Sequence, residues 1–150
     1  MITENQATIY DAGNKMLIGV SPSGHAQPIE TDHERNRAAT PLELLMVALG
    51  GCTMVDVSEI LQKKRQIVND YRVEVRGERR AEYPRSFIKL FVHHIIRGQN
   101  VAPEAVAQAV KLSDEKYCSV AATIRPGAEI VTSYEIIEES NEKESRALNS

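Results

Sequence analysis

The chain has 150 residues, of which 42% are hydrophobic and 26% charged, a balance typical of one soluble globular domain. Its net charge is -3, with Lys and Arg interspersed among Asp and Glu, which excludes the electrostatic footprint of a nucleic-acid-binding protein. No basic segment followed by an apolar run opens the sequence, and the longest apolar-rich stretch, residues 44–57, is interrupted by Gly50, Gly51 and Asp56. We therefore expect a cytoplasmic protein with no signal peptide and no membrane-spanning segment.

The first forty residues predict a small antiparallel meander. Short strand-like runs at residues 7–10 and 16–20, and a third near 27–30, are separated by turn signals rich in Gly, Asn, Ser and Pro. The polar residues 31–39 then predict a loop that carries Arg35 and Arg37.

A long helix is predicted from residue 41 to about 63–65. Thr40 at the N-cap, Pro41 at the first helical position and Glu43 at the third form a capping box. The first four turns are apolar on nearly every side, which predicts a buried central helix, and the Gly50-Gly51 pair predicts a close backbone approach. We expect one side of it to carry Leu45, Ala48, Cys52, Val55 and Glu59.

The second half predicts strands and short helices. Strict alternation predicts a strand over 71–76, and residues 86–97 predict a longer one after a charged hairpin loop, with Ile88, Leu90, Val92 and Ile96 pointing inward and the neighbours His93 and His94 on opposite faces. Helices are predicted at 103–112 and 119–124, and a last strand at 129–137. We interpret residues 1–140 as a single domain and 141–150 as a flexible tail.

The two cysteines are the chemically distinctive residues, and their sequence positions leave their role open. None of the cysteines and histidines has the short spacing of a zinc site, so we predict no metal and no other cofactor. Cys52 by itself fits a small apolar core residue. For Cys118 we expect Ser113 or Asp114 to cap its helical turn with Lys116 nearby, both of which lower a thiol pKa.

The stretch TPLELLMVALGGCTMVDVSEILQKKR, followed downstream by SDEKYCSVAATI, resembles the two cysteine signatures of the OsmC/Ohr family. The resemblance covers roughly residues 5 to 138 and includes the turn SPSGH at residues 21–25. It implies an α+β fold in which antiparallel sheets wrap around long central helices in an intertwined homodimer. It also implies that the two cysteines lie close together at the subunit interface.

The activity that this resemblance implies is thiol-dependent reduction of organic hydroperoxides. Cys52 would attack the peroxide and become a sulfenic acid, and Cys118 would condense with it to a disulfide. An external dithiol, such as a lipoyl protein or a thioredoxin-like protein, would reduce that disulfide. We expect an apolar pocket for the peroxide lined by Leu42, Leu45 and Met46.

The sequence departs from the family pattern in the charges around the reactive thiol. Leu42 stands where the family places a Glu, ten positions before the cysteine, and Glu43 is rotated about 100° around the helix. No Arg precedes Arg35, so Arg35 or Arg37 from the loop, or Arg79 or Arg80 from a partner subunit, would have to supply the guanidinium. We take Glu43 and Arg37 as the candidate charge partners of Cys52.

Two other functions remain open from the sequence. The first is a non-catalytic dimer that binds a small apolar ligand at its interface while both cysteines stay reduced. The second is a stress-linked interaction protein that uses its Glu-, Lys- and Arg-rich surface. A guanidinium within about 4 Å of a thiol would favour catalysis, because it stabilises the thiolate.

Overall fold

The computed structural model describes Met1 and residues 4–139. The chain divides into two compact units, Met1–Leu45 and Met46–Ser150, with the boundary inside the long helix, and each unit is described by itself. The single domain over residues 1–140 stays a prediction. The predicted flexible tail, residues 141–150, lies outside the described residues.

The first unit contains the predicted meander. Strands β1 (Thr8–Asp11), β2 (Met16–Val20) and β3 (Ala26–Glu30) form an antiparallel sheet in the order β1-β2-β3. The turn between β1 and β2 has a positive φ of 76° at Gly13, whose N–H is bound by Asp11 Oδ1 at 2.8 Å. A loop follows β3, as predicted, and leads into α1.

Helix α1 spans Pro41–Lys63, which confirms its predicted bounds. The backbone N–H of Thr40 donates to Glu43 Oε2 at 2.9 Å, so the capping box is formed. At the other end, Arg65 adopts a positive φ of 55° and its N–H binds the Gln62 carbonyl at 2.9 Å, which ends the helix.

The structure gives α1 a defined buried face, which the nearly all-round apolar sequence did not specify. Its buried residues are Leu49, Thr53, Val57 and Leu61, whereas Val55, which we expected on the same side as Cys52, is 58% exposed. Because the helix is apolar on nearly every side, periodicity could not indicate which face turns inward. Among the described residues, one face of α1 is covered, and Val47 and Val55 on another face are exposed.

Helix α1 extends beyond the apolar stretch 44–57, on which the expectation of no membrane-spanning segment was based. By length and composition it could cross a membrane, with a mean hydropathy of 1.7 over an 18-residue window that is 28% buried. However, it carries the hydrogen-bonded polar residues Thr53 and Asp56, and its buried stripe packs inside the second unit, to which this part of the helix belongs. These features favour the core helix of a globular protein.

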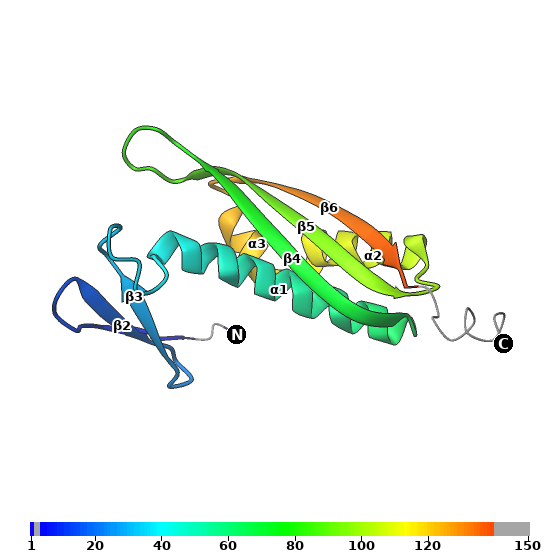
Figure 1. Cartoon of the computed structure of the whole chain (residues 1–150), viewed down its shortest axis with the longest axis horizontal. Coiled ribbons are helices and arrows are strands. Elements are labelled where there is room, and N and C mark those ends of the chain that lie inside the picture. The colour runs from blue at the N-terminus through cyan, green and yellow to red at the C-terminus, as the bar shows by residue number, and fades with distance from the viewer. Residues whose placement is uncertain (2–3, 140–150) are drawn as a thin grey trace, which may run out of the picture. The chain divides into compact units, whose positions relative to one another are not determined.

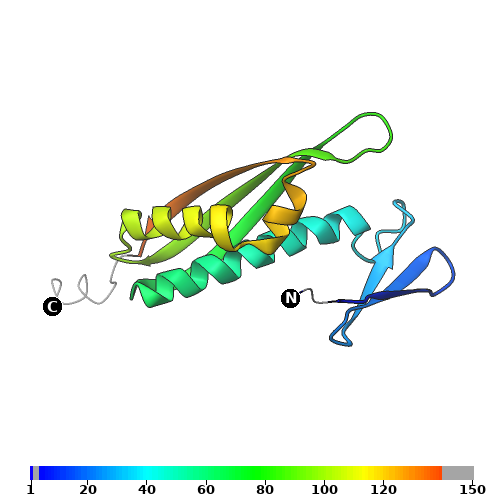
Figure 2. The same cartoon turned by 180° about the vertical axis from the view of Figure 1, so that it is seen from behind.

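The second unit is a three-stranded sheet with its helices on one face (Figures 1 and 2). Strands β4 (Ile67–Arg79) and β5 (Phe87–Gln99) form an antiparallel hairpin. Strand β6 (Glu129–Glu138) pairs with β5 in parallel, so the sheet is mixed and not wholly antiparallel as we expected. The reason is the crossover between β5 and β6, which returns the chain to the starting end of β5. It consists of α2 (Pro103–Leu112), a π-helical turn (Ser113–Tyr117) and α3 (Ser119–Ile124).

The directions of the β5 side chains are confirmed with one exception. His94 is fully buried and His93 is on the other face, as alternation predicts. Leu90, Val92 and Ile96 are buried, but Ile88 is 50% exposed because it lies near the hairpin end of the strand.

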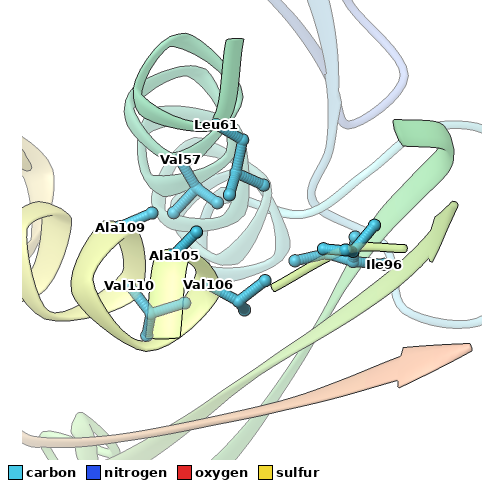
Figure 3. Packing of buried hydrophobic residues seen from close by; sticks show 8 residues of the cluster. Val57, Leu61, Ile96, Ala105, Val106, Ala109 and Val110 are labelled. Carbon is cyan, nitrogen blue, oxygen red and sulfur yellow. The ribbon is translucent and has the colours of Figure 1, made fainter. Parts of the chain in front are cut away.

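The main core lies where α1 and α2 (Pro103–Leu112) pack on the sheet (Figure 3). Val57 and Leu61 of α1 contact a stripe of α2 in which alanines alternate with valines, and Ile96 of β5 lies beneath them. The small alanine side chains let the two helices approach closely. This packing holds α1 against α2. Cys52 lies in the middle of α1, and Cys118 follows the turn that begins where α2 ends. The cluster consists of Val57, Leu61, Ile96, Val101, Ala105, Val106, Ala109 and Val110.

Candidate active site

The second unit brings the two cysteines together within a single chain. The sulfurs of Cys52 and Cys118 and a carboxylate oxygen of Asp56 all lie within 4.8 Å of one another, and both cysteines are free thiols. Cys118 is only 4% exposed, whereas Cys52 is half-buried. The proximity that the sequence resemblance implied is therefore present within one chain, and the position of the pair at a subunit interface stays a prediction.

A π-helical turn, Ser113–Tyr117, places Cys118. It continues α2, and its closing bond runs from the Cys118 N–H to the Ser113 carbonyl at 2.9 Å. Single π turns of this kind often occur at functional sites because they re-aim the residue that follows. Cys118 then serves as the N-cap of α3 (Ser119–Ile124), where its sulfur accepts the Ala121 N–H at 3.4 Å.

Burial raises the pKa of the Cys118 thiol to about 11, and the hydrogen bond with Cys52 and the charge of Asp56 act in the same direction. The Ala121 N–H lowers this pKa, but less than burial raises it. Our expectation of a lowered pKa was therefore wrong. Lys116 does not assist, since its ammonium lies over the Tyr117 ring, 5.2 Å from the centroid. Cys118 is therefore protonated at neutral pH, and its S–H can donate a hydrogen bond to the sulfur of Cys52.

Asp56 is a site residue that the sequence analysis did not single out. Its Oδ2 accepts a hydrogen bond of 3.0 Å from the hydroxyl of Ser113, which is fully buried and lies 3.0 Å from the Thr53 hydroxyl. Asp56 follows Cys52 by four positions and so lies on the same helix face. An acidic residue one turn from a cysteine in an otherwise apolar run was the signal that could have identified it.

Arg37 and Glu43, the two predicted charge partners, make structural contacts within the first unit. Arg37 Nε donates to Glu30 Oε2 at 2.7 Å and a terminal nitrogen binds the Asn14 carbonyl at 2.8 Å. Glu30 is 1% exposed, and the hydrogen bond from Arg37 holds the pKa of its carboxyl at about 2. The Glu43 carboxylate caps the helix through the Thr40 N–H. Their predicted catalytic roles stay predictions.

The described part of the second unit, residues 46–139, pairs no cation with either thiol. Within residues 46–139, no Arg or Lys forms a hydrogen bond or ion pair with Cys52 or Cys118. Arg79, a candidate from the hairpin, donates instead to the Arg85 carbonyl at 2.7 Å. A thiolate in this unit therefore depends on a thiol or amide donor or on a charge from elsewhere.

A buried tyrosine–histidine pair lies under the same helices. Tyr71 Oη is 2.6 Å from His94 Nδ1, and the rings are stacked with centroids 5.9 Å apart. Burial lowers the pKa of His94 to about 4, and the charge of His93 adds to this. Burial, together with the charge of Asp56, raises the pKa of Tyr71. The neutral His94 therefore shares a hydrogen bond with the Tyr71 hydroxyl through Nδ1, while its Nε2 has no partner among the described residues.

A pocket of about 390 Å³ opens between the second half of α1 and the start of β4. None of the residues we expected to line an apolar pocket, Leu42, Leu45 and Met46, belongs to it. Its wall combines apolar side chains with amide and carboxyl groups. Its lining residues are Ser58, Leu61, Gln62, Gln66, Val68, Asn69, Asp70 and Tyr71.

Comparison with known proteins agrees with the geometry. The model of the OsmC-like protein family matches residues 32–133, a range that includes both cysteines. The chain belongs to this family. The OsmC-like fold, α+β with two small sheets and helices, is thus established for it, as the sequence resemblance predicted.

Among its relatives, protein YhfA of Escherichia coli K12 is 43% identical over 132 residues, covering 88% of this chain and 98% of YhfA. A hypothetical protein of Aquifex aeolicus has a similar structure, with a TM-score of 0.82, 30% identity and coverage of 93% of this chain and all of that one. An organic hydroperoxide resistance protein of Legionella pneumophila shares the fold at a TM-score of 0.65 and 14% identity, with coverage of 90% and 98%.

Proposed function

We propose that this OsmC-like protein is a thiol-dependent organic hydroperoxide reductase in which Cys52 attacks the peroxide and Cys118 resolves the product. The observation that carries the proposal is the approach of the two sulfurs and the Asp56 carboxylate to within 4.8 Å inside one chain. Cys52 is partly exposed and Cys118 is buried, which favours Cys52 as the sulfur that meets the substrate. The name of the Legionella relative, an organic hydroperoxide resistance protein, supports the substrate class.

The first step forms a sulfenic acid. The thiolate of Cys52 attacks the terminal oxygen of the hydroperoxide, the O–O bond breaks, and the S–OH bond forms. The leaving alkoxide needs a proton to become an alcohol. Cys118, protonated because its pKa is about 11, is positioned beside Cys52 to supply that proton.

The second step forms the disulfide. Having lost its proton to the alcohol, the Cys118 thiolate attacks the Cys52 sulfur, the S–OH bond breaks, and hydroxide leaves. A cellular dithiol, such as a lipoyl or thioredoxin-like protein, then reduces the disulfide and is itself oxidised. A cytoplasmic location suits this cycle, because a reducing compartment regenerates the thiols.

Loss of free thiols on addition of cumene hydroperoxide tests the proposal. Wild type should lose both thiols per chain and form an intrachain disulfide. The Cys118→Ser variant should stop at a sulfenic acid that dimedone traps, and Cys52→Ser should react at least about 1000-fold more slowly, because the remaining thiol is buried and protonated. Survival of both wild-type thiols in excess peroxide at neutral pH would contradict the proposal.

The absence of a cation near the thiols within residues 46–139 favours a second candidate, a dimer that binds a small apolar ligand while both cysteines stay reduced. The same experiment separates the two. Thiols that resist peroxide but become protected from alkylation by an apolar ligand would support the binding function.

We also propose that the protein is a homodimer in which a second copy covers the exposed face of α1. Val47 and Val55 are 68% and 58% exposed, and a side chain added at Gly51 between them would meet nothing within 4 Å. These positions are four apart and form one stripe. Glycine at its centre permits close approach of another helix. The half-exposed Cys52 adjoins this stripe, so a partner could contribute to its surroundings.

An arginine at Val55 should dissociate the dimer. Burying an unpaired charge in an apolar interface is strongly unfavourable, so Val55→Arg should raise the dimer dissociation constant at least about 100-fold. Sedimentation velocity across a concentration series measures this. The control is Glu74→Arg, which places the same charge at a residue whose side chain is 60% exposed on β4. A wild type that sediments as a monomer, or a Val55→Arg variant that dimerises like wild type, would contradict the proposal.

A further inference from the structure

Two thiols and a carboxylate converge at the site from two separate segments. Cys52 and Asp56 lie one turn apart on α1, and Cys118 follows the π-helical turn, with all three ligand atoms within 4.8 Å of one another. The sequence analysis found no zinc-like spacing because these ligands are brought together by packing, not by a short motif. Thiolate and carboxylate are both established zinc ligands.

The surrounding hydrogen bonds hold this ligand set in place. The buried Ser113 hydroxyl donates to Asp56 Oδ2 and itself lies 3.0 Å from the Thr53 hydroxyl, which fixes the orientation of the carboxylate. The other carboxylate oxygen, Oδ1, has no protein partner among the described residues. The Ala121 N–H binds the Cys118 sulfur at 3.4 Å. Metal ligands are commonly oriented by hydrogen bonds of this kind from residues behind them.

The charge of the site also favours a cation. Three groups that can be anionic lie together, and within residues 46–139 no Arg or Lys pairs with the two sulfurs or with Asp56. In a tetrahedral zinc site, Zn–S bonds of about 2.3 Å and Zn–O bonds of about 2.1 Å place ligand atoms about 3.4–3.8 Å apart. Small side-chain rotations would therefore close the cluster on an ion.

We propose that the reduced protein binds one zinc ion through Cys52, Asp56 and Cys118, with the fourth coordination position open to water or an external thiol. Two thiolates select zinc over the oxygen-preferring Mg²⁺ and Ca²⁺. The half-exposed Cys52 marks the open side. Binding releases the thiol protons and involves no oxidation. Zinc and peroxide then compete for the same sulfurs, so the metal-bound protein is shielded from peroxide.

Cobalt substitution tests the proposal on the full-length, reduced, metal-free protein under anaerobic conditions. Co²⁺ should give sulfur-to-cobalt charge-transfer bands in the near ultraviolet and tetrahedral d–d bands in the visible, saturating at one ion per chain. One equivalent of Zn²⁺ should abolish both sets of absorption bands, because it displaces the cobalt. Competition with a chromophoric chelator should show zinc binding weakened at least about 10-fold in Asp56→Asn. Cys52→Ala should lose most of the charge-transfer intensity.

The matched control is Glu59→Gln, which removes an exposed carboxylate three residues further along the same helix and should leave zinc affinity unchanged. Absence of charge-transfer bands in wild type would overturn the proposal. Equal affinity in wild type and Asp56→Asn would overturn the assigned ligand set. These outcomes are independent of the peroxidase proposal, which is tested on the metal-free protein. Thiols that react with peroxide but bind no cobalt would contradict the zinc site alone.

Discussion

Replacing Gly98 with alanine should lower the free energy of unfolding by about 4 kcal/mol or more, and the melting temperature by about 8–16 °C. A Cβ at this position would lie 2.0 Å from the Ile67 carbonyl oxygen and 2.7 Å from a methyl group of Val101. Gly98 lies in β5 between β4 and β6, opposite Val68 and Glu138. The clash is with backbone, so only a shift of the strand pairing could relieve it. Urea denaturation at a fixed protein concentration measures the effect.

Gly77→Ala is the matched control for this substitution. A Cβ at Gly77, also in a strand of the same sheet, would approach the Phe87 ring to 2.4 Å, but a side chain can rotate away where a backbone cannot. We therefore expect a smaller loss than at Gly98, about 1–3 kcal/mol. A free energy of unfolding of Gly98→Ala within about 1 kcal/mol of the wild-type value would contradict the close approach between Gly98 and the Ile67 carbonyl.

Acidification from pH 7 to pH 4 should destabilise the protein by about 3 kcal/mol through His94 alone. Burial lowers the pKa of His94 from 6.5 to about 4, with His93 adding to the shift and Asp114 opposing it. Below pH 6.5 the unfolded chain therefore binds a proton that the folded chain does not. The loss begins as the pH falls through 6.5 and is complete near pH 4.

The slope of unfolding free energy against pH isolates this effect. Glu30 also destabilises the fold in acid, but its pKa falls from 4.5 to about 2, so its contribution is lost only below about pH 4.5. Between pH 6.5 and 5, His94→Gln, which keeps an acceptor for Tyr71, should flatten the slope. The control His93→Gln, on the other face of β5, should retain most of the slope, because burial is the largest cause of the lowered pKa of His94 and the charge of His93 is a smaller one. A wild-type slope that His94→Gln leaves unchanged would refute the assignment.

Local sequence signals were sufficient for most of the elements. The capping box at Thr40 and Glu43 fixed where α1 begins, and the turn signals before residue 30 separated the strands of the first sheet. Alternation in β5 also identified His93 and His94 as opposite-facing. These predictions held because caps, turns and strand alternation depend on contacts within a few residues.

Where the contacts are distant in sequence, local patterns were insufficient. The parallel pairing of β6 depends on the crossover through α2 and α3, and the inward face of α1 depends on which side meets α2. The pKa of Cys118 was expected to fall because of its helical position, yet burial under the packed unit raises it to about 11. Desolvation is a property of the tertiary environment, which no local motif encodes.

The sequence by itself determined the family, the positions of Cys52 and Cys118, and the helices that carry them. Only the tertiary structure decided that both sulfurs meet within one chain, that Asp56 joins them through the Ser113 hydrogen bond, and that Arg37 binds Glu30. The physical reason is that the chemistry of a thiol depends on the neighbours within about 5 Å. Here those neighbours come from α1, the π-helical turn and α3, which the folded core holds together.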